Sequence, residues 1–259
     1  MLRAVLLWAS QNKTLAQRLP NYRFARKAVT RFMPGEQVED ALRAAEELKG
    51  SRITTVITRL GENITSLSDA ADVETHYEDV LQTIAALKLE TQISVKLTQL
   101  GLDVDQARCN ENLDRLADQA RRCNNFMWID IEYSSYVDRT LASFSSVRGN
   151  HTNVGLCLQA YLHRTPKDLE QVLRSTTAIR LVKGAYREGP EVAIQAKKDV
   201  DAAYMRLATR LLEEVATGRE VGSPPAFATH DLPMLRRITG LARDLGIAND
   251  AFEIQMLYG

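Results

Sequence analysis

The chain has 259 residues, a length typical of one large domain, and 45% of them are hydrophobic while 25% are charged. Its 33 lysines and arginines balance its 33 aspartates and glutamates. The totals therefore provide no net field that would draw the protein to nucleic acid or to an acidic membrane. Apolar residues recur at regular spacing throughout, which excludes disorder for most of the chain.

The three cysteines, Cys109, Cys123 and Cys157, form no CxxC pair and no cluster with histidine. This pattern argues against a disulfide framework and against a structural zinc site. The apolar run at residues 4–9 is too short to span a bilayer, and no small-residue cleavage site follows it. We therefore expect a cytoplasmic protein.

Helical periodicity alternates with short runs of β-branched and apolar residues along most of the chain. Most of these runs are continuously apolar, which is typical of strands buried on both faces. In chain order, the pattern predicts a helix at 36–49, a strand at 53–58, a helix around 73–84, a strand at 92–97, a helix around 113–120, strands at 126–131 and 154–160, a short helix after Thr165, a strand at 178–182, a helix at 191–216, a strand at 226–229, a helix at 232–245 and a strand at 252–257.

Strands that alternate with helices predict an α/β fold with a parallel sheet. At this length the natural solution is a (β/α)8 TIM-like barrel, and a doubly wound open sheet is the alternative. A barrel needs eight strands, whereas the last predicted strand ends close to Gly259. We therefore expect a barrel with about seven strands, incomplete at its C-terminus. The expected division is an N-terminal helical arm over residues 1–50 and a β/α barrel over residues 51–259.

Polar side chains gather at the predicted carboxyl ends of the strands, where parallel barrels carry their active sites. A charged or amide group inside a buried strand is costly unless it finds a partner, so the set indicates a polar site at one mouth. It contains no cluster with metal-ligand spacing, so we expect no metal, and GxGxxG and P-loop patterns are absent. The residues are Arg59, Glu62, Lys96, Asp130, Glu132, Gln159, Arg180, Lys183, Thr229, His230, Asp231, Glu253 and Gln255.

Each of these residues also has a purely structural interpretation. Lys96 fits the solvent-facing position of an edge strand, and Asp130 fits a capping or loop pair with the glutamate that follows it. Arg180 and Lys183 fit partners of those acids in a structural ion-pair network. A lone histidine such as His230 is more often structural than catalytic. Spacing alone therefore predicts a barrel with a polar mouth and leaves its function open.

Five strings at the strand ends carry a more specific signal, because they occur in one order along the chain. They are SVKLTQLG (94–101), QAYLHR (159–164), RLVKGAY (180–186), FATHD (227–231) and FEIQMLYG (252–259). Together with RFMPGE at 31–36, this pattern resembles the proline dehydrogenase family over residues 31–259.

The resemblance implies a distorted (β/α)8 barrel that binds FAD non-covalently at the carboxyl ends of its strands. It implies oxidation of L-proline to Δ1-pyrroline-5-carboxylate, with a hydride transferred to FAD and the electrons passed to a membrane quinone. L-proline and a quinone are thus the expected partners, and nucleic acid is not. Peripheral contact with the inner membrane and the oligomeric state are left open.

The resemblance also implies roles for individual residues. Asp130 and Arg180 would be catalytic: Arg180 would reach the flavin N5 region, where the hydride arrives, and Asp130 would hold Lys96 in place against the substrate carboxylate. The remaining contacts would come from Tyr186 and Leu257 as walls of the proline pocket, and from Ile131, Gln159, Lys183, Gly184, Ala185, Thr229 and His230 around FAD.

The family continues beyond its seventh strand into an eighth strand and a final helix, which carries an arginine pair that clamps the proline carboxylate. Because the sequence ends at Gly259, we expect this chain to lack that clamp and to bind proline poorly. Two alternatives follow. The chain is a flavin dehydrogenase of another cyclic or N-substituted amino acid, or a catalytically impaired barrel that serves as a binding or regulatory module.

Overall fold

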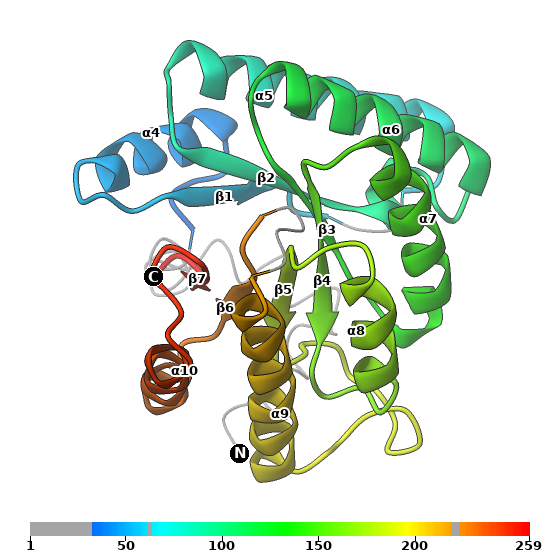
Figure 1. Cartoon of the computed structure of the whole chain (residues 1–259). Coiled ribbons are helices and arrows are strands. Elements are labelled where there is room, and N and C mark those ends of the chain that lie inside the picture. The colour runs from blue at the N-terminus through cyan, green and yellow to red at the C-terminus, as the bar shows by residue number, and fades with distance from the viewer. Residues whose placement is uncertain (1–32, 62–63, 219–222) are drawn as a thin grey trace, which may run out of the picture.

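The seven strands of the chain form one curled parallel sheet whose outer side is covered by helices (Figure 1). This computed structural model describes residues 33–61, 64–218 and 223–259. The strand order is β1-β2-β3-β4-β5-β6-β7, so each strand pairs with its neighbours in sequence. A doubly wound sheet reverses its strand order, and this sheet does not. The expected TIM-like architecture with seven strands is confirmed.

Six of the strands lie within their predicted ranges and are one to three residues shorter, and β2 begins and ends one residue earlier than expected. They are β1 (Thr55–Thr58), β2 (Thr91–Lys96), β3 (Met127–Asp130), β4 (Val154–Gln159), β5 (Ile179–Val182), β6 (Ala226–Ala228) and β7 (Glu253–Gln255). The helices are α4 (Val38–Lys49), α5 (Leu67–Ala86), α6 (Gln106–Arg122), α7 (Val137–Asn150), α8 (Thr165–Leu173), α9 (Lys197–Ala216) and α10 (Leu232–Asp244), with 3₁₀ turns η2 (Leu97–Leu100) and η3 (Ser134–Tyr136).

Helix α7 was not expected from the sequence. Its buried face is formed by Val137, Leu141, Phe144 and Val147, which do recur at the helical spacing. Three serines and a glycine within the helix lower its intrinsic helix propensity and obscure that pattern. Packing against the sheet stabilises a segment that its composition alone does not favour.

Helix α9 begins at Lys197, later than the expected start at residue 191. The preceding residues lie instead against the turn that follows β4. Ala193 forms an antiparallel bridge with Leu162, and the Ile194 amide donates to the Tyr161 carbonyl at 2.8 Å. These backbone bonds to a neighbouring loop compete with helical ones, which is why periodicity misplaced the start.

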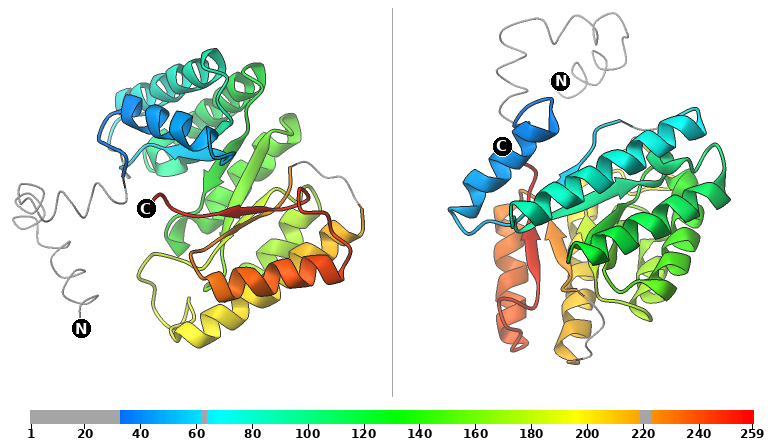
Figure 2. Two further views of the ribbon diagram at one scale, coloured as in Figure 1. Left: turned by 90° about the vertical axis from the view of Figure 1, so that its left-hand side faces the viewer. Right: turned by 90° about the horizontal axis from the view of Figure 1, so that it is seen from above.

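The α4 helix is the described part of the expected N-terminal arm, since residues 1–32 lie outside the described residues. It contacts β1, at the edge of the sheet opposite β7, as the two views of Figure 2 also show. The division into an arm and a barrel at residue 50 stays a prediction. Within residues 33–61, 64–218 and 223–259, no helix has both the length and the apolar content needed to cross a membrane.

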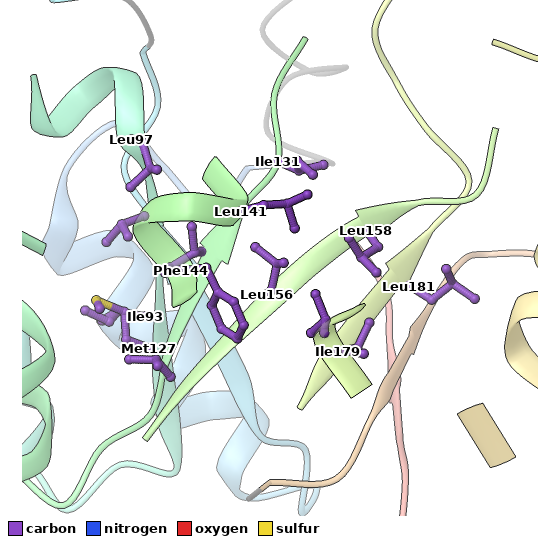
Figure 3. Close-up of a cluster of buried hydrophobic side chains, with 14 of the residues drawn as sticks. Ile93, Leu97, Met127, Ile131, Leu141, Phe144, Leu156, Leu158, Ile179 and Leu181 are labelled. Atoms are coloured by element: carbon purple, nitrogen blue, oxygen red, sulfur yellow. The ribbon is translucent and has the colours of Figure 1, made fainter. Parts of the chain in front are cut away.

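The alternation of side chains along the strands gives the sheet two different faces. Ile93, Met127 and Leu156 point outwards and form an apolar cluster with Phe144 of α7 (Figure 3). The residues between them face the inside of the curl and include many polar groups. Those that matter below are Gln92, Ser94, Lys96, Trp128, Asp130, Cys157, Gln159, Arg180 and Gln255.

Two buried tyrosines connect helices to the ends of strands. The Tyr77 hydroxyl of α5 donates to the Ser94 carbonyl at 2.8 Å and accepts from the Arg59 amide at 3.0 Å. Burial raises the pKa of Tyr77 to about 12, so this hydroxyl keeps its proton and its donor role at neutral pH. The Tyr204 hydroxyl of α9 donates to the Leu181 carbonyl at 3.0 Å. Both bonds fix a helix in register with the strand that it covers.

Replacing Tyr77 with phenylalanine tests this connection. The variant leaves the buried Ser94 carbonyl and the Arg59 amide without their hydroxyl partner, so its free energy of unfolding should fall by about 1–3 kcal/mol. Urea unfolding followed by circular dichroism measures the change. The exposed Tyr258, replaced in the same way, is the control and should leave the midpoint unchanged. Equal midpoints for the two variants would contradict the prediction.

Candidate active site

Arg180 of β5 carries its charge into the inside of the curl, where groups from other strands surround it. Its Nη2 donates to Asp130 Oδ1 at 2.5 Å and to Ser94 Oγ at 2.5 Å, and its Nη1 lies 3.5 Å from Gln255 Oε1. Burial alone would lower the pKa of Arg180, but the Asp130 carboxylate outweighs it and the pKa is raised. The guanidinium therefore remains fully charged although its side chain is only 10% exposed.

Lys96 joins this cluster through the same carboxylate. The register of β2 and β3 places Lys96 beside Asp130, and Lys96 Nζ lies 3.8 Å from Asp130 Oδ2. The carboxylate thus stands between two cations, and the three groups together carry one excess positive charge. Because β2 lies between β1 and β3, the interpretation of Lys96 as an edge-strand residue is wrong. The structure brings together Lys96, Asp130 and Arg180, as the sequence suggested.

Gln159, at the end of β4, is 2% exposed and only partly satisfied. Its Nε2 donates to the Glu132 carbonyl at 2.8 Å, whereas its Oε1 is buried and has no hydrogen-bond partner among the described residues. A buried acceptor without a partner is unusual and marks a position where a ligand can donate. The side chain of Ile131 belongs to the apolar cluster, which leaves its backbone for a ligand contact (Figure 3).

Lys183, one residue after β5, joins two helices through their carboxylates. Its Nζ donates to Asp201 Oδ1 of α9 at 2.6 Å and to Asp231 Oδ2 at 2.8 Å. Asp231 is also the N-cap of α10, because it accepts a bond from the Met234 amide. The idea that Lys183 pairs with the acids that follow β3 is therefore wrong. Its side chain holds the loops after β5 and β6 together and leaves its backbone for any ligand.

The loop after β5 approaches the β4 end so closely that one position requires glycine. Gly184 has a positive φ of 119°, and a Cβ there would lie 2.2 Å from Tyr161 Cδ1. The Tyr161 hydroxyl in turn donates to the Tyr186 carbonyl at 3.2 Å, and the Tyr186 ring lies 4.3 Å from that of Tyr133. Ala185 is exposed between them. These contacts fix the backbone of this loop at the mouth of the curl.

The other predicted site residues are held less tightly. The Thr229 amide donates to the Gln255 carbonyl, and its hydroxyl accepts from the Asp231 amide. His230 is exposed, and Leu257 is 81% exposed. The described residues therefore do not enclose Leu257 as a pocket wall. Glu62 lies outside the described residues.

Two residues of the cluster were missed in the sequence. Ser94 lies two positions before Lys96, and Trp128 lies two positions before Asp130. The alternation of a strand places each of them on the same face as the charged residue that follows it. This period of two was the available signal, but a serine and a tryptophan in a strand look like ordinary core residues.

Known proteins match this chain over most of its length. A family model described as proline dehydrogenase matches residues 41–259. Proline dehydrogenase 2 of Bacillus subtilis (strain 168) is 33% identical over 235 residues, which cover 91% of this chain and 75% of that relative. The chain belongs to the proline dehydrogenase family. The resemblance inferred from the five strings is thereby confirmed, and the family's members are oxidoreductases of proline catabolism.

Other relatives agree with this assignment. Proline dehydrogenase 1 of Bacillus subtilis (strain 168) is 32% identical over 259 residues and covers all of this chain and 83% of the relative. Proline dehydrogenase of Deinococcus radiodurans is 32% identical over 234 residues, with coverage of 88% and 73%. Among solved structures, proline utilization A from Bdellovibrio bacteriovorus, inactivated by N-propargylglycine, matches with a TM-score of 0.78. That match covers 90% of this chain but 29% of the other at 24% identity, so it shows the fold alone.

Replacing Lys183 with methionine tests its connection to the two helices. Near neutral pH the variant should lose about 1–3 kcal/mol of unfolding free energy, because two partly buried carboxylates lose a charged donor. Bonds to Lys183 lower the pKa of Asp231, and they outweigh burial to lower the pKa of Asp201. The contribution of these carboxylates is therefore present above their ordinary pKa and is lost as pH falls through the folded values.

The pKa of Lys183 is itself raised, because its bonds to the two carboxylates outweigh burial. Its contribution is complete below the ordinary lysine pKa and is lost only as pH rises through the folded value. Urea unfolding at neutral pH and near pH 3 should therefore show a gap between wild type and Lys183→Met that shrinks in acid. A gap of equal size at both values would contradict this, and Lys198→Met, at an exposed position, is the control.

Proposed function

We propose that this chain oxidises L-proline to Δ1-pyrroline-5-carboxylate with hydride transfer to non-covalently bound FAD, from which electrons pass to a quinone. Family membership supports the substrate and the type of reaction. The observation that carries the proposal is the cluster of Lys96, Asp130 and Arg180 at the carboxyl ends of neighbouring and facing strands. This is the edge at which parallel barrels hold their substrates.

The residues at the mouth fit a flavin. The buried and unpartnered Gln159 Oε1 can accept from a ring N–H of the isoalloxazine. The absence of a Cβ at Gly184 makes room for Tyr161, and we assign the backbone of Gly184 to the ribityl or phosphate side of the cofactor. The backbone of Lys183 and Ala185, with Thr229 and His230, would complete that side. FAD, when bound, supplies the hydride acceptor, and the protein supplies orientation and charge.

Arg180 would stabilise the negative charge that develops near flavin N5. Nη2 donates to Asp130 and Ser94, Nη1 makes a long contact to Gln255, and the neighbouring Cys157 thiol also bonds to the guanidinium. Because its bond to Gln255 is long, Nη1 is the atom that we assign to the ligand. Because Asp130 already holds the guanidinium in place, Arg180 would stabilise the transition state without having to move.

Lys96 would bind the carboxylate of the substrate. Its side chain is 14% exposed, so its attraction to an anion is screened less than at the surface. The single excess positive charge of the cluster also disfavours a protonated amine nearby, which favours the neutral ring nitrogen that hydride donation requires. The Asp130 carboxylate attracts both cations and holds them at fixed positions. Tyr186 would form one wall of the proline pocket.

An anaerobic absorption spectrum of the purified chain with FAD, recorded before and after adding L-proline, tests the proposal. We expect a bound-flavin spectrum whose visible band bleaches with L-proline. If the flavin stays oxidised with L-proline but bleaches with another cyclic or N-substituted amino acid, that compound would be the substrate in place of L-proline. A chain that binds no flavin, or flavin that none of these compounds reduces, would overturn the proposal in favour of a binding module.

Replacing Lys96 with methionine should raise the L-proline concentration for half-maximal flavin reduction by about 10- to 100-fold, since a charge-assisted contact is lost. The affinity for FAD should change little, because Lys96 is assigned to the substrate. Stopped-flow reduction and FAD titration measure the two quantities. Lys198→Met is the matched control at an exposed lysine. An unchanged half-saturation for Lys96→Met would remove this residue from the substrate site.

A further inference from the structure

Trp128 lies across the inside of the curl, one alternation below Asp130. The residue is completely buried, and its Nε1 donates to Gln92 Oε1 of β2 at 2.6 Å. The opposite edge of the indole lies over β4, because a Cβ built on Gly155 would be 2.7 Å from Trp128 Cζ3. The ring therefore extends from β2 to β4, on both sides of its own strand.

Gly155 is what allows this extension. The register places Gly155 directly beside Trp128, and a Cβ there would also lie 2.9 Å from the Ala178 carbonyl. Any larger residue would push the indole back from β4. The strand after β4 is β5, which carries Arg180. The Trp128 ring therefore extends across β4 toward Arg180, although Trp128 itself belongs to β3.

The indole meets the guanidinium that the proposed reaction uses. Arg180 Cζ lies 5.0 Å from the centroid of the Trp128 ring. Nη2 donates to Asp130 and Ser94, whereas Nη1 has only the long 3.5 Å bond to Gln255 and is held less firmly. The indole face packs against the guanidinium and limits the displacement of Nη1, and the attraction between a cation and an indole is strongest where water is excluded.

We propose that Trp128 is a positioning residue for Arg180 and that Gly155 provides the space it needs. The inference rests on the proposed function, because the position that matters is that of Nη1 toward the flavin. Trp128 is too deeply buried to touch a substrate itself, so it acts through Arg180. Without the ring, Arg180 would keep its charge and its bond to Asp130 but would no longer hold Nη1 at one place.

Sulfite affinity of the FAD-loaded chain tests the inference without any amino-acid substrate. Sulfite adds to N5 of an oxidised flavin and bleaches its visible band, and a fixed positive charge nearby strengthens the addition. Trp128→Leu should weaken sulfite binding by about tenfold, the change expected for a buried cation–π contact. Trp128→Phe keeps an aromatic surface and should stay within about threefold of wild type. Unchanged sulfite affinity in Trp128→Leu would overturn the inference.

Two further comparisons separate positioning from loss of packing. Phe227 of β6 is equally buried but faces the helices, so Phe227→Leu removes a core aromatic group without approaching Arg180 and should leave sulfite affinity unchanged. Gly155→Ala should weaken sulfite binding in the wild-type background, because it displaces the indole. Its effect should be smaller in the Trp128→Leu background, where the indole is absent and only the contact with the Ala178 carbonyl remains.

A double-mutant cycle on the unfolding of the apoprotein tests the contact independently of FAD. Urea midpoints of Trp128→Leu, Arg180→Met and the double variant should be non-additive, and additive midpoints would overturn the inference. If L-proline fails to reduce the wild-type flavin, the proposed function fails while the sulfite comparison still decides the role of Trp128. If the wild type binds no FAD, the double-mutant cycle on the apoprotein decides whether Trp128 contacts Arg180 as proposed.

Discussion

A guanidinium placed inside a β-strand must find partners, and this requirement connects the two halves of the sheet. Arg180 of β5 obtains one of its bonds from Ser94 of β2 at 2.5 Å. In a flat sheet, strands three positions apart lie roughly 14 Å from each other, too far for this contact. The bond therefore exists only because the sheet curls. The side chain of Arg180 therefore links the curvature of the sheet to the formation of the site.

Sequence reasoning located the strand ends and most of the charged residues, because both depend on local patterns. Lys96, Asp130 and Arg180 were identified since each is a charged residue within or near the end of an apolar run. Their pairing was one of the interpretations that the sequence left open, and choosing it required the register and the curvature of the sheet. The interpretation of the apolar runs as strands buried among apolar groups on both faces was incomplete, since alternate residues line a polar interior.

The errors have the same origin. One structural interpretation paired Lys183 with Asp130 and Glu132, but its side chain binds Asp201 in α9 and Asp231, the N-cap of α10. The late start of α9 follows from backbone bonds to the β4 loop, which no periodicity reveals. Trp128 was overlooked because its role depends on the absence of a side chain at Gly155, in another strand. Contacts between distant segments decide each of these cases.

The strand order also determines how the chain can acquire this structure while it is being synthesised. Because β1 to β7 pair strictly in sequence, each new strand meets an edge that has already left the ribosome. Growth of the sheet in one direction means that each strand pairs with the strand made just before it. We expect Arg180 to find Asp130 and Ser94 as soon as β5 docks, so that β7 meets a guanidinium that already has its carboxylate partner. Strand β7 is then added to a site whose polar interior is largely formed.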